Sequence, residues 1–239
     1  MKADVNTSNL QRLQSFQILG GQLKGIEATL CDSSTWAEGL TDSLPPLREK
    51  EVERVAKLRD SEVAKRLRAS LVCGRVIIGE RLGLLANEVR ITRSSEGAPR
   101  LENKPERSVS ISRSANWTLV ALGDGRAIGA DVEVMRTLDW RAMLGMVCSE
   151  PEAKAFLTLA EREPGEAQRA FFTLWTIKEA VLKATGHGMR AGAKSVAVPV
   201  DDLVRRVQLL REIEVAGTVY IVWSGWEADV ALSLAIARD

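Results

Sequence analysis

Hydrophobic residues recur at two spacings along this chain, and the two spacings predict different elements. Apolar positions follow the helical period within residues 47–85, 138–147, 150–160 and 168–185. Shorter apolar runs favour strands at residues 108–112, 117–122, 127–134, 195–200, 208–213, 219–224 and 230–236. A tight connection through residues 123–126 predicts that the first three strands form an antiparallel meander, and residues 94–108 indicate a loop. The order of these elements predicts an α+β fold with a mainly antiparallel sheet.

One predicted strand carries two acids on a single face. In residues 127–134 the four even-numbered positions are apolar, whereas Gly129, Asp131 and Glu133 occupy the opposite face. Carboxylates two positions apart lie about 6.6 Å apart along a strand, so both can reach one cation. The plain alternative is a half-buried strand with charged outer residues, although two like charges on one face repel each other.

The strongest predicted helix, residues 168–185, carries a glutamate and two lysines. Glu179 and Lys183 are four residues apart and share a face, and Lys178 lies about 100° round the helix from Glu179. The simplest alternative is a surface ion pair worth about 0.3 kcal/mol. Together with the strand acids, these side chains suit a divalent cation and a pyrophosphate, because phosphoryl-type transfer depends on positioning and charge neutralisation.

Composition changes this picture mainly by exclusion. The 239 residues carry a formal net charge of +1, which gives no overall field that favours nucleic acid or membranes. A single histidine excludes multi-histidine zinc and iron sites, so a metal here would have oxygen ligands, as magnesium and manganese prefer. Three separated cysteines, no apolar leader and no apolar run of about 18 residues favour a reduced, cytoplasmic protein.

Two linked motifs resemble the 4'-phosphopantetheinyl transferases of the surfactin-synthetase-activating type. The first is Gly-Ala-Asp-Val-Glu at residues 129–133. The second is Trp-Thr-Ile-Lys-Glu at residues 175–179, with Lys183 and a Gly-His-Gly turn at residues 186–188. Their order and spacing fit that family, and the resemblance extends more weakly from about residue 44 to about residue 200.

The resemblance implies an architecture and a reaction. The expected protein is a monomer of two similar α+β halves, residues 1–123 and 124–239, related by pseudo-twofold symmetry with the active site in the cleft between them. The family transfers the 4'-phosphopantetheine group from coenzyme A to a serine of an acyl or peptidyl carrier protein, and releases adenosine 3',5'-bisphosphate.

The same resemblance implies roles for single residues. By position, Asp131, Glu133 and Glu179 are the expected ligands of Mg²⁺, with Mn²⁺ as the alternative. Glu179 and Lys183 are the expected catalytic residues, Glu179 as the group that activates the serine hydroxyl directly or through water. The side chains expected to contact coenzyme A are Lys50, Arg66, Ser112, Arg113, Lys178 and Lys183. Glu152 falls where some members carry an assisting acid.

Two positions depart from the family pattern. Ser112-Arg113 stands where the family usually has Ser-His, and Gly97-Ala98-Pro99 stands where it favours Gly-Lys-Pro. Arginine still binds phosphate but is longer and always charged, and Arg100 is a candidate replacement for the lost lysine. These changes bear on coenzyme A affinity more than on chemistry. The alternative function is therefore a catalytically weak coenzyme A or carrier-protein binding module of the same fold.

The carrier protein is expected to dock beside the metal-binding strand, on a basic and apolar surface that complements an acidic partner. Its candidate residues are Arg136, Trp140, Arg141, Met143, Leu144 and Met146. The alternative is that Trp140, Met143 and Leu144 belong to the core. Lysine biosynthesis and secondary metabolism stand as alternative pathways, and neither nucleic acid nor membrane is an expected partner.

Overall fold

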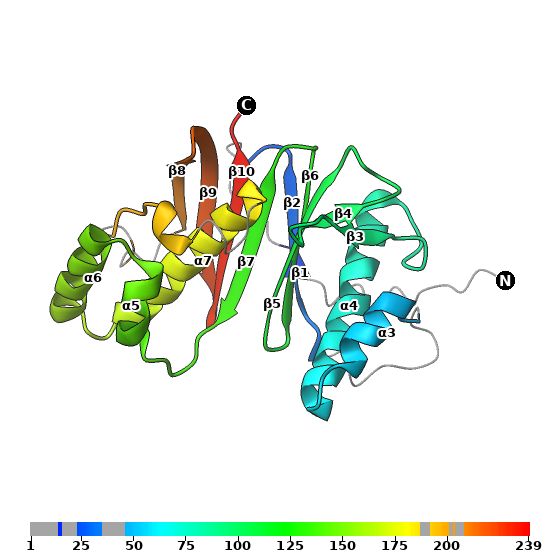
Figure 1. Cartoon of the computed structure of the whole chain (residues 1–239), viewed down its shortest axis with the longest axis horizontal. Helices are drawn as coiled ribbons and strands as arrows, with labels where there is room; N and C mark the ends of the chain where they lie inside the picture. Colours follow the sequence, from blue (N-terminus) through cyan, green and yellow to red (C-terminus); the bar gives the residue numbers. More distant parts are fainter. Residues whose placement is uncertain (1–13, 16–22, 35–45, 187–191, 201–202, 204–207) are drawn as a thin grey trace.

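Two four-stranded antiparallel sheets form the centre of the molecule (Figure 1). The computed structural model describes residues 14–15, 23–34, 46–186, 192–200, 203 and 208–239. The first sheet has the order β1 (Gln14–Ser15), β2 (Ile26–Asp32), β6 (Trp117–Gly123), β5 (Ser108–Ser114). The second has the order β7 (Ile128–Val134), β10 (Val230–Ala237), β9 (Thr218–Glu227), β8 (Leu209–Val215). A separate hairpin pairs β3 (Ile91–Arg93) with β4 (Pro99–Leu101).

The helices cover the outer faces of the two sheets (Figure 1). On the first side lie α3 (Glu49–Ala56) and α4 (Ser61–Leu82). On the second side lie α5 (Trp140–Val147), α6 (Glu150–Arg162), α7 (Ala167–Thr185) and the short 3₁₀ helix η2 (Ala193–Ser195). The Asp60 carboxylate caps the start of α4, and Gly186 ends α7 in the left-handed conformation that glycine adopts without strain.

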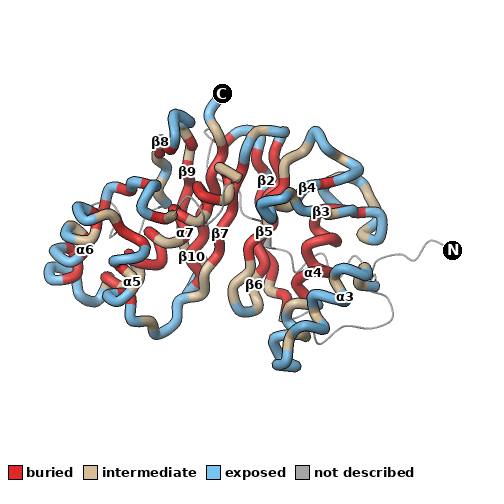
Figure 2. Tube along the Cα trace, in the orientation of Figure 1, coloured by how far each residue is buried: buried red, intermediate tan, exposed pale blue. Residues whose placement is uncertain are grey.

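Alternation along the strands divides the apolar residues among three layers of core (Figure 2). In β7, Ile128, Ala130 and Val132 share the apolar face that the sequence predicted, and this face packs between the two sheets. In β6, alternate residues contribute to the core between the sheets and to the core beneath α4. The third core lies between the second sheet and α5–α7. The layers therefore follow the order helix, sheet, sheet, helix.

The two sheets share a connection order. In each, the first long strand is followed by helices, and it then pairs with the last strand of that sheet: β2 with β6, and β7 with β10. The last strand in turn pairs with the strand before it in sequence. This correspondence agrees with two similar α+β halves, and the pseudo-twofold relation between them stays a prediction.

Several elements differ from those predicted. The central meander is wrong, because β5 and β6 pair with each other whereas β7 joins the other sheet. Residues 47–85 form two helices separated near Asp60, and residues 195–200 form no strand. The strand β2 and the β3–β4 hairpin were not predicted. His187 and Gly188 of the predicted turn lie outside the described residues.

The closest approach between sheet and helix occurs where β7 passes beneath α7. A Cβ atom built on Gly129 would lie 1.8 Å from the Ala180 carbonyl oxygen and 2.7 Å from the Ala184 nitrogen. Only glycine fits at this distance, so Gly129 sets how near the acids of β7 lie to the side chains of α7.

Within the part of the chain that the structure describes, every helix is too short or too polar to cross a lipid bilayer.

Candidate active site

Serine side chains join two edge strands that belong to different sheets. β5 lies at the edge of the first sheet and β7 at the edge of the second. Ser110 Oγ accepts a hydrogen bond from the Ala130 N–H at 3.0 Å, and Ser114 Oγ accepts one from the Val134 N–H at 3.1 Å. The serines thus satisfy backbone donors that an edge strand would otherwise leave unpaired. This contact holds the acids of β7 beside β5.

Asp131 lies buried at the centre of this junction, with 4% of its surface exposed. Ser112 Oγ donates to its Oδ1 at 2.7 Å, and Lys183 Nζ donates to the same oxygen at 2.6 Å. Burial raises the pKa of the Asp131 carboxyl, and the charge and hydrogen bonds of Lys183 and Ser112 oppose that rise. Three side chains predicted from distant parts of the sequence therefore meet here.

Glu133 lies two residues further along β7, nearer to solvent. Its Oε2 accepts hydrogen bonds from Ser114 Oγ at 2.8 Å and from Arg136 Nη1 at 3.0 Å. The side chain is 20% exposed. The two strand acids thus have different surroundings, one buried beside a lysine and one at the rim beside an arginine.

Glu179 faces these acids from α7. Burial and the charges of Asp131 and Glu133, opposed by Lys183, together raise the pKa of its carboxyl to about 6. The influence of the strand acids on Glu179 shows that the three carboxyl groups lie within electrostatic reach of one another. A carboxyl with a pKa near neutrality can also exchange a proton under physiological conditions.

The carboxylate oxygens of Asp131, Glu133 and Glu179 suit a hard divalent cation, although the described structure does not bring all three groups within bonding distance of one position. Asp131 Oδ2 and Glu179 Oε1 are buried and have no hydrogen-bond partner among the described residues. Buried carboxylate oxygens without partners are costly, and a cation with oxygen ligands would satisfy them. Over the described ranges, however, no three acid, histidine or cysteine side chains converge closely enough to hold a metal.

Lys178 does not join this group, which contradicts its predicted contact with pyrophosphate. Its ammonium is fully buried and lies 2.9 Å from both carboxylate oxygens of Glu152. It also donates to the carbonyl oxygens of Ala193 at 3.0 Å and Val196 at 2.6 Å. A lysine bound in this way ties α7 to α6, to η2 and to the residue after η2, and it has no surface to offer a ligand.

Glu152 is equally committed to the fold. Its carboxylate accepts hydrogen bonds from the Ser149 N–H, the Ser149 hydroxyl and the Val198 N–H, in addition to Lys178. The first of these bonds belongs to a capping box at the start of α6, in which the Glu152 N–H donates in return to the Ser149 hydroxyl. An assisting catalytic role for Glu152 therefore does not fit this geometry.

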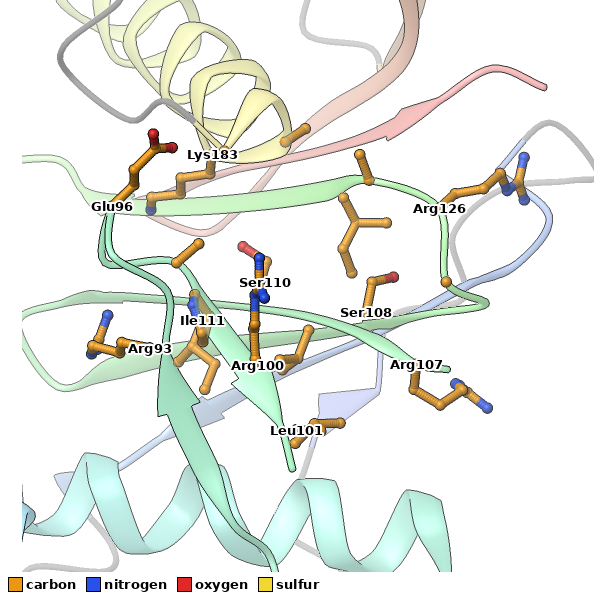
Figure 3. A pocket seen from close by; sticks show the side chains of 18 of the residues that line it. Arg93, Glu96, Arg100, Leu101, Arg107, Ser108, Ser110, Ile111, Arg126 and Lys183 are labelled. Carbon is orange, nitrogen blue, oxygen red and sulfur yellow. The ribbon is translucent and has the colours of Figure 1, made fainter. Parts of the chain in front are cut away.

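A cavity of about 580 Å³ lies between the β3–β5 region and the end of α7, and Lys183, which contacts Asp131, lines it (Figure 3). Five cationic side chains and a single acid line it: Arg93, Arg100, Arg107, Arg126, Lys183 and Glu96. Ion pairs with Glu27 and Asp124 neutralise Arg107 and Arg126. The cavity is therefore a basic site of a size that suits a nucleotide-like anion. The Gly97-Ala98-Pro99 loop forms part of its wall.

Arg113 lies within electrostatic reach of two other arginines, Arg54 and Arg93, and of the three Arg93 lines the cavity. Burial, together with the charges of Arg54 and Arg93, lowers the pKa of Arg113 to about 10. Arg113 Nε donates to Ser70 Oγ, which is itself hydrogen-bonded to Thr118 Oγ1 at 2.7 Å. Like charges held together in this way are stabilised by a bound anion.

The structure brings other predicted residues to different places. Lys50 and Arg66 are exposed on α3 and α4, and neither lines the cavity. Trp140 and Leu144 are buried in the core beneath α5, and Met143 packs against that core, so the core alternative is confirmed for them. Met146 is exposed, as is Arg136, and Arg141 stacks on the Trp140 ring at 4.2 Å.

Sequence reasoning missed several members of this site. Ser110 and Ser114 repeat the spacing of Ser112 along one face of β5, a period-two pattern of serines that could have been noticed. Arg93 had no local signal, because only the fold brings it near Arg113.

Comparison with known proteins gives one consistent result. A family model described as the 4'-phosphopantetheinyl transferase superfamily matches residues 127–234, which include β7 and α7. The 4'-phosphopantetheinyl transferase HetI of Nostoc sp. is 31% identical over 154 residues, or 63% of this chain and 64% of HetI. The 4'-phosphopantetheinyl transferase Sfp of Bacillus subtilis is 24% identical over 152 residues, or 61% of this chain and 63% of Sfp.

A fungal protein matches more of the chain. The L-aminoadipate-semialdehyde dehydrogenase-phosphopantetheinyl transferase of Eremothecium gossypii is 30% identical over 202 residues, or 82% of this chain and 71% of that protein. The matches to HetI and Sfp span less than two thirds of those relatives' own length.

Proposed function

We propose that this chain, which belongs to the 4'-phosphopantetheinyl transferase superfamily, transfers the 4'-phosphopantetheine group of coenzyme A to a serine of a carrier protein. The observation that carries the proposal is the position of Lys183. Its ammonium contacts Asp131 among the acids, and its side chain also lines the basic cavity. One lysine thus links a site for a divalent cation to a site for a phosphorylated nucleotide.

The basic cavity is the proposed site of the nucleotide part of coenzyme A. Arg93 and Arg100 have no carboxylate at ion-pair distance among the described residues, so their charges are available to phosphate oxygens. Lys183 would neutralise the pyrophosphate next to the acids. Arg113, which replaces the histidine usual in the family, would add a third arginine near the nucleotide phosphates.

The proposed reaction is a single displacement at phosphorus. The serine oxygen of the carrier forms a bond to the phosphorus that bears the pantetheine arm, and the bond from that phosphorus to the bridging oxygen breaks. Adenosine 3',5'-bisphosphate leaves with the bonding electrons, and Glu179 takes the serine proton directly or through water. The raised pKa of Glu179 suits this exchange, since an acid with a pKa near 6 can both accept and release a proton near pH 7.

Asp131, Glu133 and Glu179 would hold Mg²⁺ or Mn²⁺, which when bound neutralises charge on the pyrophosphate. The fit rests on the unpartnered oxygens of Asp131 and Glu179 and on a donor set made of carboxylates.

The finer properties of the protein belong to the same proposal. We expect a cytoplasmic monomer in which residues 1–123 supply most nucleotide contacts and residues 124–239 supply the acids and Lys183. The partner would be an acyl or peptidyl carrier protein that approaches along the exposed Arg136 and Met146 side of the molecule.

Intact-protein mass spectrometry of an apo carrier protein tests the proposal directly. The carrier is incubated with this protein, coenzyme A and Mg²⁺, and a parallel sample contains EDTA. A gain of one phosphopantetheine mass that EDTA prevents is the expected result. Coenzyme A binding without any mass gain, over both acyl and peptidyl carriers, would contradict transfer and would favour a coenzyme A binding module instead.

A further inference from the structure

Lys183 uses all three donor hydrogens on groups at the β5–β7 junction. Its Nζ lies 2.6 Å from Asp131 Oδ1, 2.8 Å from Ser112 Oγ and 3.1 Å from the Ala130 carbonyl oxygen. The side chain is nevertheless 30% exposed, and it extends from α7 along the wall of the cavity (Figure 3). The ammonium therefore sits at the boundary between the acids and the open cavity.

The ammonium occupies a position in which a divalent cation would meet strong repulsion. A cation that binds Asp131 would share that carboxylate with a positive charge already 2.6 Å from one of its oxygens. Like charges that share one buried carboxylate repel each other strongly, and a divalent ion doubles the repulsion of a monovalent one. Metal and ammonium are therefore alternative counter-ions for Asp131.

The chain contains a second buried lysine pair that shows what a fixed ion pair looks like. Lys178 has no exposed surface, and both oxygens of its partner Glu152 are satisfied. In contrast, Asp131 keeps Oδ2 without a partner among the described residues, and Lys183 keeps contact with the cavity. Of these two pairs, the Lys183 pair is the one that combines a carboxylate oxygen without a hydrogen-bond partner and a cavity into which the ammonium can turn.

We propose that Lys183 is a displaceable counter-ion, which neutralises Asp131 when no divalent cation is bound and turns into the cavity to meet an anionic diphosphate when the cation binds. Metal binding releases the ammonium, and the diphosphate gives it a new partner, so each ligand favours binding of the other through this residue. The inference rests on the proposed function, because it takes the diphosphate to be that of coenzyme A. Reciprocity requires both ligands to gain affinity by the same factor.

The test measures Mn²⁺ binding without a carrier protein, so that no turnover occurs. Free Mn²⁺ is followed by its electron paramagnetic resonance signal, with and without coenzyme A, in the unaltered protein and in Lys183→Met. We expect coenzyme A to strengthen Mn²⁺ binding to the unaltered protein by about tenfold or more. Lys183→Met should bind Mn²⁺ about tenfold more tightly without coenzyme A, and should lose most of the enhancement.

Three further variants make the outcome decisive. Lys65→Met removes an exposed lysine paired with Glu62 on α4, far along the chain from the site, and should leave Mn²⁺ binding unchanged. Ser112→Ala keeps the ammonium charge but removes one of its acceptors, so it should shift Mn²⁺ affinity in the same direction as Lys183→Met, by a smaller factor. Asp131→Asn should abolish Mn²⁺ binding at the site.

The possible failures are distinct. If Mn²⁺ binds the unaltered protein and is lost in Asp131→Asn, but Lys183→Met binds it no more tightly, the counter-ion role is wrong and the metal site of the proposed function stands. If neither the unaltered protein nor Lys183→Met binds Mn²⁺, the metal site and the counter-ion role both fail. Should Lys183→Met fail to fold, an unchanged Mn²⁺ affinity in Ser112→Ala overturns the inference.

Discussion

Two lysines five residues apart on one helix have opposite environments. Five residues correspond to a rotation of about 140°, so Lys178 and Lys183 leave α7 on different sides. The helical spacing allowed Glu179 and Lys183 to be placed on one face from the sequence. It gave no sign that Lys178 would meet Glu152 and two backbone carbonyls, because those partners come from α6, from η2 and from the residue after η2.

At Lys178 the prediction concerns stability. Lys178→Met leaves the Glu152 carboxylate buried without its counter-ion, which is expected to lower the free energy of unfolding by about 3–5 kcal/mol. Urea unfolding followed by circular dichroism measures this loss. Lys65→Met, which removes an exposed lysine, should change the free energy of unfolding by less than about 0.5 kcal/mol. Equal effects of the two substitutions would show that the buried pair is not needed for folding.

Glu179 should make the metal-free protein less stable at high pH. Burial raises the pKa of this acid from 4.5 to about 6, so the folded state binds its proton more tightly than the unfolded state does. The stability that this protonation supplies is fully present below pH 4.5 and is lost as the pH rises through 6. Glu179→Gln removes the buried charge and should stabilise the protein at pH 8 by about 1 kcal/mol, a value discounted for partial exposure.

Thermal or urea unfolding in EDTA at pH 8 and pH 4.5 measures the effect of Glu179→Gln. The variant and the unaltered protein should have similar stability at pH 4.5, where Glu179 is largely protonated in the folded state. Transferase activity should be lost at both pH values, because the amide neither ligates a cation well nor accepts a proton. If Glu179→Gln were less stable than the unaltered protein at pH 8, the ionised Glu179 side chain would not lower the free energy of unfolding of the folded protein.

At the scale of elements, local periodicity identified the parts of the site but not how the strands are paired. The alternation in β7 correctly separated Asp131 and Glu133 from the apolar face, because that strand has one face in the core between the sheets. The pairing of β7 with β10, about 100 residues later, left no local signal, and the meander was therefore wrong. Similarly, the short β3–β4 hairpin lies in a polar segment that resembles a loop.

The distance between β7 and α7 is expected to depend on one glycine. Gly129→Ala would place a methyl group 1.8 Å from the Ala180 carbonyl oxygen and 2.7 Å from the Ala184 nitrogen. Both are backbone atoms, which cannot move away by a change of side-chain rotamer. Overpacking of this kind should lower the free energy of unfolding by about 3 kcal/mol and should also reduce activity, since it moves Asp131 away from Glu179.

Gly145→Ala is the matched control for this substitution. Gly145 lies exposed in α5, and a Cβ atom built there has no neighbour within 4 Å. Alanine favours the helix, so the variant should be about 0.5–1 kcal/mol more stable than the unaltered protein. Chemical denaturation of both variants gives the comparison. If Gly129→Ala proved as stable as Gly145→Ala, the close contact between β7 and α7 would not be a constraint.

At the scale of the whole molecule, the site exists only because both sheets are present. Arg93 and Ser112 come from the first half, whereas Asp131 and Lys183 come from the second. The core between the sheets draws residues from β2 and β6 as well as from β7 and β10, so the two halves should unfold together. A sequence motif found in the second half alone could predict the acids, but not the basic cavity, to which residues 93–111 of the first half contribute a wall.

Because the cavity has walls from both halves, a ligand bound there should stabilise the whole protein. Adenosine 3',5'-bisphosphate, the proposed product, should raise the free energy of unfolding by about 2.7 kcal/mol at a concentration one hundred times its dissociation constant.

Arg113→Met removes a cation that lies near Arg54 and Arg93. Loss of this charge should therefore not lower the free energy of unfolding of the ligand-free variant. The increase in that free energy on binding of the bisphosphate should be smaller by about 1–3 kcal/mol. Arg238→Met, which removes an exposed arginine paired with Glu212, should keep the full gain. Thermal unfolding in buffers of equal ionic strength measures all three proteins, since screening by salt alone would act on each of them alike. An Arg113→Met protein that gains as much from the bisphosphate as the unaltered protein would remove Arg113 from the nucleotide site and leave its charge to Arg93, Arg100 and Lys183.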